Sequence, residues 1–199
     1  MKQLSDFPST YLITPEPPIG EPLDNFIADL ERSLSAGIRL VQLRAKSVTE
    51  PQYVWLAEQA LECCRRHSAR LLLSASLNVA LTVEADGVHL TSARLMSCNS
   101  RPMPPEFLLS VACHDAHQIR HAEQIGADLI TLSPVLPTKT HTSAEPLGWA
   151  RFRELVSLTS IPVYALGGMS AQTLPASLDA GANGIAAIRG LWKGTVEWS

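Results

Sequence analysis

The sequence predicts an α/β fold in which eight strand–helix units close into a single (β/α)8 barrel, the TIM barrel. Short apolar runs alternate with segments of helical periodicity along the chain, an order typical of parallel sheets with crossover helices. Eight such runs favour closure into a barrel over an open, doubly wound sheet, which is the alternative. The length of 199 residues suits one domain, which we assign to residues 1–199.

The first half of the chain contains four of the expected strands. The first strand, 10–14, is followed by a helix with apolar side chains every three or four residues. Gly37 follows this helix as a stop signal, and Pro51 lies in the first turn of the next one. The remaining elements of this half are expected as strands at 38–43, 70–73 and 87–90 and as helices at 50–67 and 77–82.

The second half contains four more strands, after a proline-rich connection for which we predict no helix. The expected elements are strands at 107–111, 129–132, 162–166 and 184–188 and helices at 115–125, 149–158 and 171–178. Because typical barrels of this type are longer, the last helix must be truncated. Only residues 189–194 and a short tail remain for it.

The composition of the chain indicates which partners and which cellular compartment to expect for this protein. A net charge of −3 provides no electrostatic case for nucleic acid, and no apolar run approaches the roughly 20 residues that span a bilayer. We therefore expect neither nucleic acid nor a membrane as partner. The first residues lack the apolar core of a signal peptide, and the four cysteines show no Cys-x-x-Cys spacing. These features predict a cytoplasmic protein with free thiols.

Polar side chains continue past the predicted second strand. Gln42, Arg44 and Lys46 alternate with Leu43 and Ala45, so the three polar side chains project to the same side. Active sites of parallel barrels lie at the carboxyl ends of the strands. Two cations at that end predict an anionic ligand, and a solvated cluster on the rim is the alternative.

The loop after the predicted sixth strand is also suited to an anion. It carries Thr138, Lys139, Thr140 and His141 between an apolar strand and the next helix. Hydroxyls and cations at this place are the groups that hold anionic substrates. We therefore expect a small phosphorylated substrate.

Two strand ends close to the C-terminus suggest a phosphate site. The seventh strand ends in Gly167 and Gly168, and the eighth ends in Ile188 and Arg189. Barrels often bind phosphate between the loops after these two strands, where glycine allows backbone N–H groups to approach the ligand. Arg189 would add a charge-assisted contact. A Gly-Gly pair required only for the turn is the alternative.

Six segments in chain order resemble the thiamin phosphate synthase/TenI family of small barrels. The segments are Val-Gln-Leu-Arg-Ala-Lys (41–46), Ala-Asp-Gly-Val-His-Leu (85–90), Gly-Ala-Asp-Leu-Ile (126–130), Pro-Val-Leu-Pro-Thr-Lys-Thr (134–140), Pro-Val-Tyr-Ala-Leu-Gly-Gly-Met (162–169) and Ala-Gly-Ala-Asn-Gly-Ile-Ala-Ala-Ile (180–188). The chain is especially similar to the family-type domain that some bacteria carry fused to a Nudix hydrolase. The resemblance implies a role in thiamin biosynthesis, with a homodimer and a Nudix hydrolase as expected partners.

The resemblance implies two activities. Synthases join a hydroxymethylpyrimidine pyrophosphate to a thiazole phosphate with Mg²⁺, whereas tautomerases move protons on a thiazole carboxylate phosphate without metal. By resemblance, the pyrimidine and pyrophosphate are held by Gln42, Arg44, Lys46, Thr138, Lys139 and Thr140. The thiazole phosphate is held by Gly167, Gly168, Ile188 and Arg189.

The chain departs from both patterns. Ser74 and Ala75 stand where synthases carry Asn-Asp, and residues 91–94 lack the acidic metal ligand expected there. Mg²⁺ is usually held through carboxylates, so we predict no metal site, and Mg²⁺ would be a cofactor only if synthase activity is retained. Ala112 replaces an expected serine, and Ser133 stands at the position of the tautomerase histidine.

Three histidines near strand ends are candidates for acid–base chemistry, because an imidazole titrates near neutral pH. They are His89, His114 and His141. We assign catalytic roles to His141, on the substrate loop, and to Lys46; a surface position of His141 is the alternative. His89 is interpreted as a hydrogen-bonded barrel residue.

The leading hypothesis is a thiamin-pathway enzyme that binds a phosphorylated thiazole between Gly168 and Arg189. Its reaction would be a proton transfer or a variant condensation, as in an isomerase or a transferase of this family. An authentic thiamin phosphate synthase is the first alternative. The second is a non-catalytic ligand-binding or regulatory barrel that serves a separately encoded Nudix hydrolase.

Overall fold

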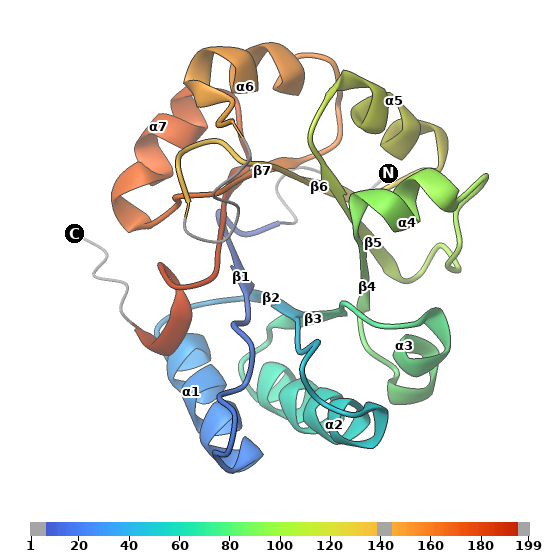
Figure 1. The fold of residues 1–199 in the computed structure, drawn as a ribbon, viewed down its shortest axis with the longest axis vertical. Helices are drawn as coiled ribbons and strands as arrows, with labels where there is room; N and C mark the ends of the chain where they lie inside the picture. The colour runs from blue at the N-terminus through green and yellow to red at the C-terminus, as the bar shows by residue number, and fades with distance from the viewer. Residues whose placement is uncertain (1–6, 139–144, 195–199) are drawn as a thin grey trace.

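The sheet is a closed barrel of eight parallel strands in a computed structural model that describes residues 7–138 and 145–194 (Figure 1). Each strand pairs with its neighbours in chain order, and β1 pairs with β8. Closure leaves no free edge and excludes the open sheet. The strands are β1 Thr10–Ile13, β2 Leu40–Leu43, β3 Arg70–Leu73, β4 Gly87–Leu90, β5 Leu108–Cys113, β6 Leu129–Leu132, β7 Val163–Leu166 and β8 Gly184–Ala187.

Helices form a ring around the strands (Figure 1). The α-helices are α1 Leu23–Ser35, α2 Glu50–Arg66, α3 Leu77–Val83, α4 Ser92–Ser97, α5 Ala116–Gln124, α6 Gly148–Val156 and α7 Leu174–Asp179. The 3-10 segments η2 Ala171–Thr173 and η3 Trp192–Gly194 accompany them. Over these described ranges, none of the helices has the length and apolar character needed to cross a membrane.

Two helices differ from the prediction. α4 was not predicted, because it is a short helix in a segment rich in prolines; Thr91 caps it by accepting a hydrogen bond from the N–H of Arg94. The helix expected at 171–178 is divided into a 3-10 turn and α7, and Pro175 lies in the first turn of α7. The other elements lie where the periodicity placed them, with ends that differ by a few residues.

The short segment η3 takes the place of an eighth helix. It packs on α1, beside which it lies in Figure 1. The rings of Phe26 and Trp192 are 5.0 Å apart. The N–H of Lys193 donates to Ser33 Oγ at 2.9 Å, and its ammonium pairs with Asp29 at 2.8 Å. The predicted truncation of the last helix is therefore confirmed.

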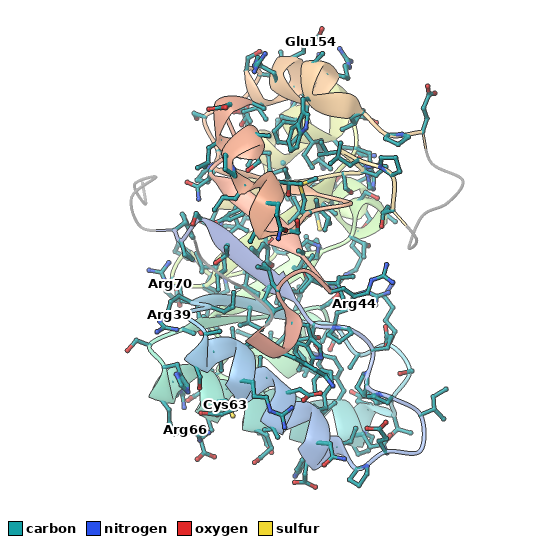
Figure 2. The ribbon with its side chains drawn as sticks, turned by 90° about the vertical axis from the view of Figure 1, so that its left-hand side faces the viewer. Arg39, Arg44, Cys63, Arg66, Arg70 and Glu154 are labelled. Atoms are coloured by element: carbon teal, nitrogen blue, oxygen red, sulfur yellow. The ribbon has the colours of Figure 1, made fainter. Side chains whose placement is uncertain are left out.

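Side chains of each strand alternate between the surrounding helices and the barrel axis. Those that point inward near the amino ends form a packed layer of Tyr11, Leu40, Leu72, Leu108, Leu129 and Tyr164. Phe7 joins this layer, and the Arg70 guanidinium lies 5.6 Å from the Phe7 ring centroid. Figure 2 shows Arg39 and Arg70 at this end and Arg44 at the opposite end. The layer fills the amino end of the barrel, so the interior is open towards the carboxyl ends.

Candidate active site

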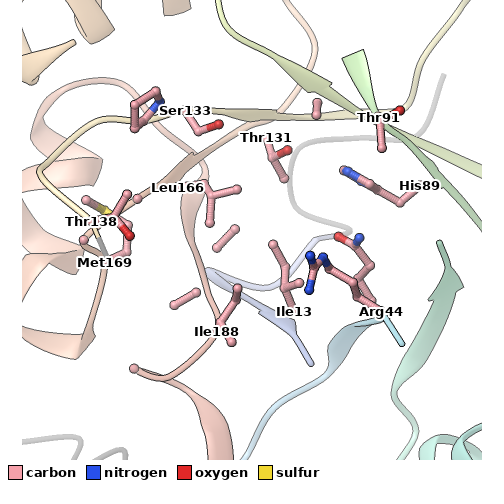
Figure 3. Close-up of a pocket in the computed structure, with 18 of the residues that line it drawn as sticks. Ile13, Arg44, His89, Thr91, Thr131, Ser133, Thr138, Leu166, Met169 and Ile188 are labelled. Atoms are coloured by element: carbon pink, nitrogen blue, oxygen red, sulfur yellow. The ribbon is translucent and has the colours of Figure 1, made fainter. Parts of the chain in front are cut away.

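A cavity of about 680 Å³ opens at the carboxyl ends of the strands, and every strand end contributes to its wall (Figure 3). Eight of the residues predicted from the sequence line it, namely Gln42, Arg44, Lys46, Thr138, Gly167, Gly168, Ile188 and Arg189. Lys139, Thr140 and His141 lie outside the described residues. The structure thus brings the described candidates to one cavity, and their functional roles remain predictions.

The β2 side of the cavity is organised by a carboxylate that was not singled out from the sequence. Glu16 Oε1 accepts a hydrogen bond from Arg44 Nη1 at 2.7 Å. Glu16 Oε2 accepts from the N–H groups of Lys46 and Ser47 at 2.7 and 3.1 Å. Thr14 adds two hydrogen bonds to the backbone of Arg44. Glu16 lies just past the end of the first strand and matches no motif that we used, so only its contacts across the strands reveal its position.

The two glycines after β7 are required by the packing of loops. Both have positive φ angles, +99° for Gly167 and +72° for Gly168. A Cβ on Gly168 would lie 2.8 Å from Leu136 Cβ, in the loop after β6. The N–H of Leu136 donates to the Gly167 carbonyl at 3.1 Å. Packing between the loops therefore requires glycine at both positions, and this requirement does not conflict with ligand binding at the same place.

Backbone N–H groups after β7 and β8 are available to a ligand. Those of Gly168, Arg189 and Gly190 have no hydrogen-bond acceptor within residues 7–138 and 145–194. A Cβ on Gly190 would lie 2.5 Å from the Met169 carbonyl oxygen, so only glycine fits there. The exposed Arg189 side chain stands at the same wall. N–H donors beside a guanidinium are well suited to the oxygens of a phosphate.

Deeper in the cavity lies a buried histidine. His89 is only 6% exposed, and its Nδ1 lies 2.8 Å from Ser110 Oγ, as expected for a hydrogen-bonded barrel residue. The hydroxyl of Tyr11 lies 3.3 Å from Ser110 Oγ and 3.5 Å from Gln42 Oε1. Burial, together with the charge of Arg94, lowers the pKa of His89 to about 3. The imidazole is therefore neutral at physiological pH.

A second histidine stands next to the position of the tautomerase residue. His114, just after β5, lines the cavity, and its Nδ1 lies 2.8 Å from the Ser133 carbonyl oxygen. A carbonyl only accepts, so Nδ1 donates the proton in this contact. The preferred candidate His141 lies outside the described residues, so the structure neither supports nor contradicts its role.

The residues present do not fit a Mg²⁺ site. The residues that line the cavity include no Asp or Glu, and residues 139–144 contain none in their sequence. Glu16, beside the cavity, is engaged by Arg44 and two backbone N–H groups. The described part of the chain holds no group of three potential metal ligands. The side chains therefore supply no carboxylate for a hard cation.

Fold and cavity together define a (β/α)8 barrel whose largely apolar cavity carries cationic and N–H donor groups at its mouth and a few buried polar side chains inside. The family model described as Thiamine monophosphate synthase (TMP-TENI) matches residues 10–191. The chain belongs to this family.

Individual relatives support the same family assignment. The chain is 36% identical over 183 residues to a "Putative thiamine-phosphate synthase 2" of Aquifex aeolicus, covering 92% of this chain and 97% of that one. It is 34% identical over 180 residues to a "Thiamine-phosphate synthase" of Methanospirillum hungatei, covering 89% and 86%. A solved thiamine phosphate pyrophosphorylase from Pyrococcus furiosus has a TM-score of 0.73 at 24% identity, covering 90% and 85%, and supports the fold.

Proposed function

We propose that this protein acts in thiamin biosynthesis and binds a phosphorylated thiazole at the carboxyl ends of β7 and β8. The observation that carries the proposal is the set of available N–H groups at Gly168, Arg189 and Gly190 beside the Arg189 guanidinium. A phosphate monoester offers the oxygens that such donors bind. The names of the relatives, thiamine-phosphate synthases, support a thiamin precursor over other phosphate esters.

Different residues of this chain would bind the phosphate, contact the ring and take part in the reaction. The N–H groups after β7 and β8 anchor the phosphate, and Leu166 and Ile188 offer apolar contact to the ring. Arg44 and Lys46 would stabilise negative charge on the β2 side, such as that of a departing pyrophosphate in a condensation. In a proton transfer, an imidazole removes a proton from the substrate and returns it at another atom. His141 is our candidate for that role, and Lys46 for a catalytic cation.

Calorimetric titration with thiazole phosphate and thiamin phosphate tests the proposal. The wild type should bind thiazole phosphate, and Arg189→Ala should bind it more weakly because one cation is lost. Arg151→Ala is the matched control, because Arg151 is an exposed arginine on α6 that does not line the cavity. No binding at millimolar thiazole phosphate would overturn the proposal.

An authentic synthase is the second candidate, favoured by Gln42, Arg44 and Lys46 lining one cavity. Incubation with both substrates and Mg²⁺ should then yield thiamin phosphate, and a chelator should abolish the yield. Binding of both substrates without product would instead favour the non-catalytic barrel. A homodimer and a Nudix hydrolase partner are proposals that light scattering, alone and after mixing, would test.

A further inference from the structure

Thr131, on β6, carries a buried hydroxyl that lacks a partner. The residue is 0% exposed, and its Oγ1 has no hydrogen-bond partner in the described part of the chain. Buried hydroxyls in native proteins are paired in the large majority of cases, because burial removes them from water. Such an exception calls for a physical explanation.

The position of Thr131 offers that explanation, because the residue lines the cavity. In β6 it alternates with Leu129, which packs inside the barrel below it, so both side chains point towards the axis. Figure 3 shows the Thr131 side chain projecting from the strand, with its oxygen on the side where His89 lies. A ligand in the cavity would therefore be able to supply the missing partner.

Thr131 is one of several buried polar residues that line the cavity. Gln42 and His89 are also buried and line the same cavity, and we call these two residues and Thr131 the polar floor. Nδ1 of His89 is hydrogen-bonded to Ser110 Oγ, whereas its Nε2 has no partner within the ranges that the structure describes. The floor thus presents a hydroxyl, a ring nitrogen and an amide.

The polar floor carries no formal charge. Threonine and glutamine are neutral, and the buried imidazole of His89 stays unprotonated at physiological pH because burial lowers its pKa. An anion at this depth would lose its hydration without a cation on the floor to compensate. Uncharged atoms with hydrogen-bonding capacity are the groups that this floor accommodates best.

We infer that Thr131 is a specificity-determining residue whose hydroxyl, with His89 Nε2, hydrogen-bonds uncharged polar atoms of a heterocyclic ring in the bound ligand. The phosphate oxygens of the same ligand stay above, at Arg44, Lys46 and Arg189. A ring that lacks such atoms would leave the Thr131 hydroxyl unpaired and bind more weakly. The inference rests on the proposed function, because it takes a phosphorylated heterocycle as the ligand.

Two variants of Thr131 isolate the hydroxyl. Thr131→Val removes it at nearly constant shape, and Thr131→Ser keeps it. Calorimetry would measure dissociation constants for thiazole phosphate, thiamin phosphate, free hydroxymethylpyrimidine and inorganic pyrophosphate. We expect Thr131→Val to weaken binding of the ring ligands about three- to tenfold, as for one hydrogen bond, and to leave pyrophosphate unchanged. Thr131→Ser should bind like the wild type.

The melting temperature of the ligand-free variants distinguishes ligand binding from a structural role. Thr131→Val should melt no lower than the wild type, because it removes an unpaired buried hydroxyl. A lower melting temperature together with weaker pyrophosphate binding would show a structural role and overturn the inference. Unchanged affinities for every ring ligand would show that the hydroxyl holds at most a water, and would overturn it too.

The ligand panel separates the two proposals. A wild type that binds hydroxymethylpyrimidine but not thiazole phosphate would overturn the proposed function, and the effect of Thr131→Val on pyrimidine affinity would still decide the role of Thr131. If the wild type binds thiazole phosphate and Thr131→Val binds every ring ligand as well as the wild type does, only the inference is overturned. Binding of no ring ligand would overturn both.

Discussion

The rim of the cavity is cationic and partly exposed, whereas the polar floor is uncharged and buried. Arg44, Lys46 and Arg189 stand at the rim, where water screens charge and anions exchange readily. The floor is buried, so a charge placed there would be costly. The unpaired hydroxyl of Thr131 already carries such a cost. Charge at the rim would select ligands with anionic ends, and hydrogen bonding at the floor would select among their rings.

The rim itself has two unlike sides. On the β2 side, Arg44 is held by Glu16, so anion binding depends on a side chain and its ion pair. On the β7–β8 side, the donors are N–H groups of Gly168 and its neighbours, which depend on backbone shape. Side-chain substitutions should therefore weaken the first side more than the second.

Acid should destabilise the folded protein because its uncharged floor resists protonation. His89 has a folded pKa of about 3 and an ordinary pKa of 6.5, so between these values the unfolded chain binds a proton that the folded chain does not. Stability should therefore fall as pH decreases through this window, by about 1.4 kcal/mol per pH unit and on the order of 4 kcal/mol in total. Urea unfolding at several pH values measures the loss.

His89→Gln provides the control for this prediction, because glutamine is neutral throughout the window. Groups other than His89 titrate alike in both proteins, so the difference in unfolding free energy between wild type and variant isolates the imidazole. That difference should shrink as pH falls from 6.5 to 3. A difference that is constant with pH would show that His89 becomes protonated in the folded protein as readily as in the unfolded one.

Gly168→Ala should disrupt the backbone side of the rim. Its φ of +72° disfavours any side chain, and the new Cβ would lie 2.8 Å from Leu136 Cβ and 3.0 Å from the Pro137 carbonyl oxygen. We expect a loss of about 3 kcal/mol in unfolding free energy, from backbone strain plus overpacking. Thiazole phosphate affinity should fall as well, because the N–H group moves.

Gly20→Ala is the matched control, because Gly20 has a φ of +82° but no atom within 4 Å of the added Cβ. It should lose only the strain contribution, about 1 kcal/mol. Equal losses in the two variants would contradict the role that we give to close packing between the loops after β6 and β7.

The barrel was predictable because its signals are local. Strand and helix periodicity repeats along the chain, and the rule that sites lie at strand carboxyl ends then placed Arg44, Gly168 and Arg189 in one cavity. α4 was missed because six residues that include a single buried side chain, Leu95, form no clear periodic pattern.

The roles of Thr131 and Glu16 were not predictable, because each depends on which side chains meet across the barrel. Tyr11 and Ser110 are 99 positions apart, and Glu16 and Arg44 are 28 apart. In the sequence, Thr131 is one residue of an apolar strand, and only the packed structure shows that its hydroxyl is unpaired. Closure of the sheet, which no single segment encodes, creates these contacts.

Arg44→Ala and Arg189→Ala should sharpen the comparison of the two sides of the rim. We expect Arg44→Ala to weaken pyrophosphate binding about tenfold or more. The variant lacks the guanidinium that Glu16 holds at the rim, and with it the charge-assisted hydrogen bond that we expect from this guanidinium to the ligand. Arg189→Ala should weaken thiazole phosphate binding by less than about fivefold, because the backbone N–H groups remain. Calorimetry measures both, with Arg151→Ala as the control. A larger effect for Arg189 would reverse our assignment of the two sides.

Salt should produce the smallest effect and should separate rim from floor without any mutation. Raising NaCl to about 0.5 M shortens the screening length to a few ångströms, so pyrophosphate at the exposed rim should bind a few-fold more weakly. Free hydroxymethylpyrimidine, which is uncharged, should bind the floor with unchanged affinity, because its hydrogen bonds to Thr131 and His89 would be buried. Parallel calorimetric titrations at low and high salt measure both. If the two ligands responded equally to salt, they would share one exposed site, and the division between a charged rim and a neutral floor would be wrong.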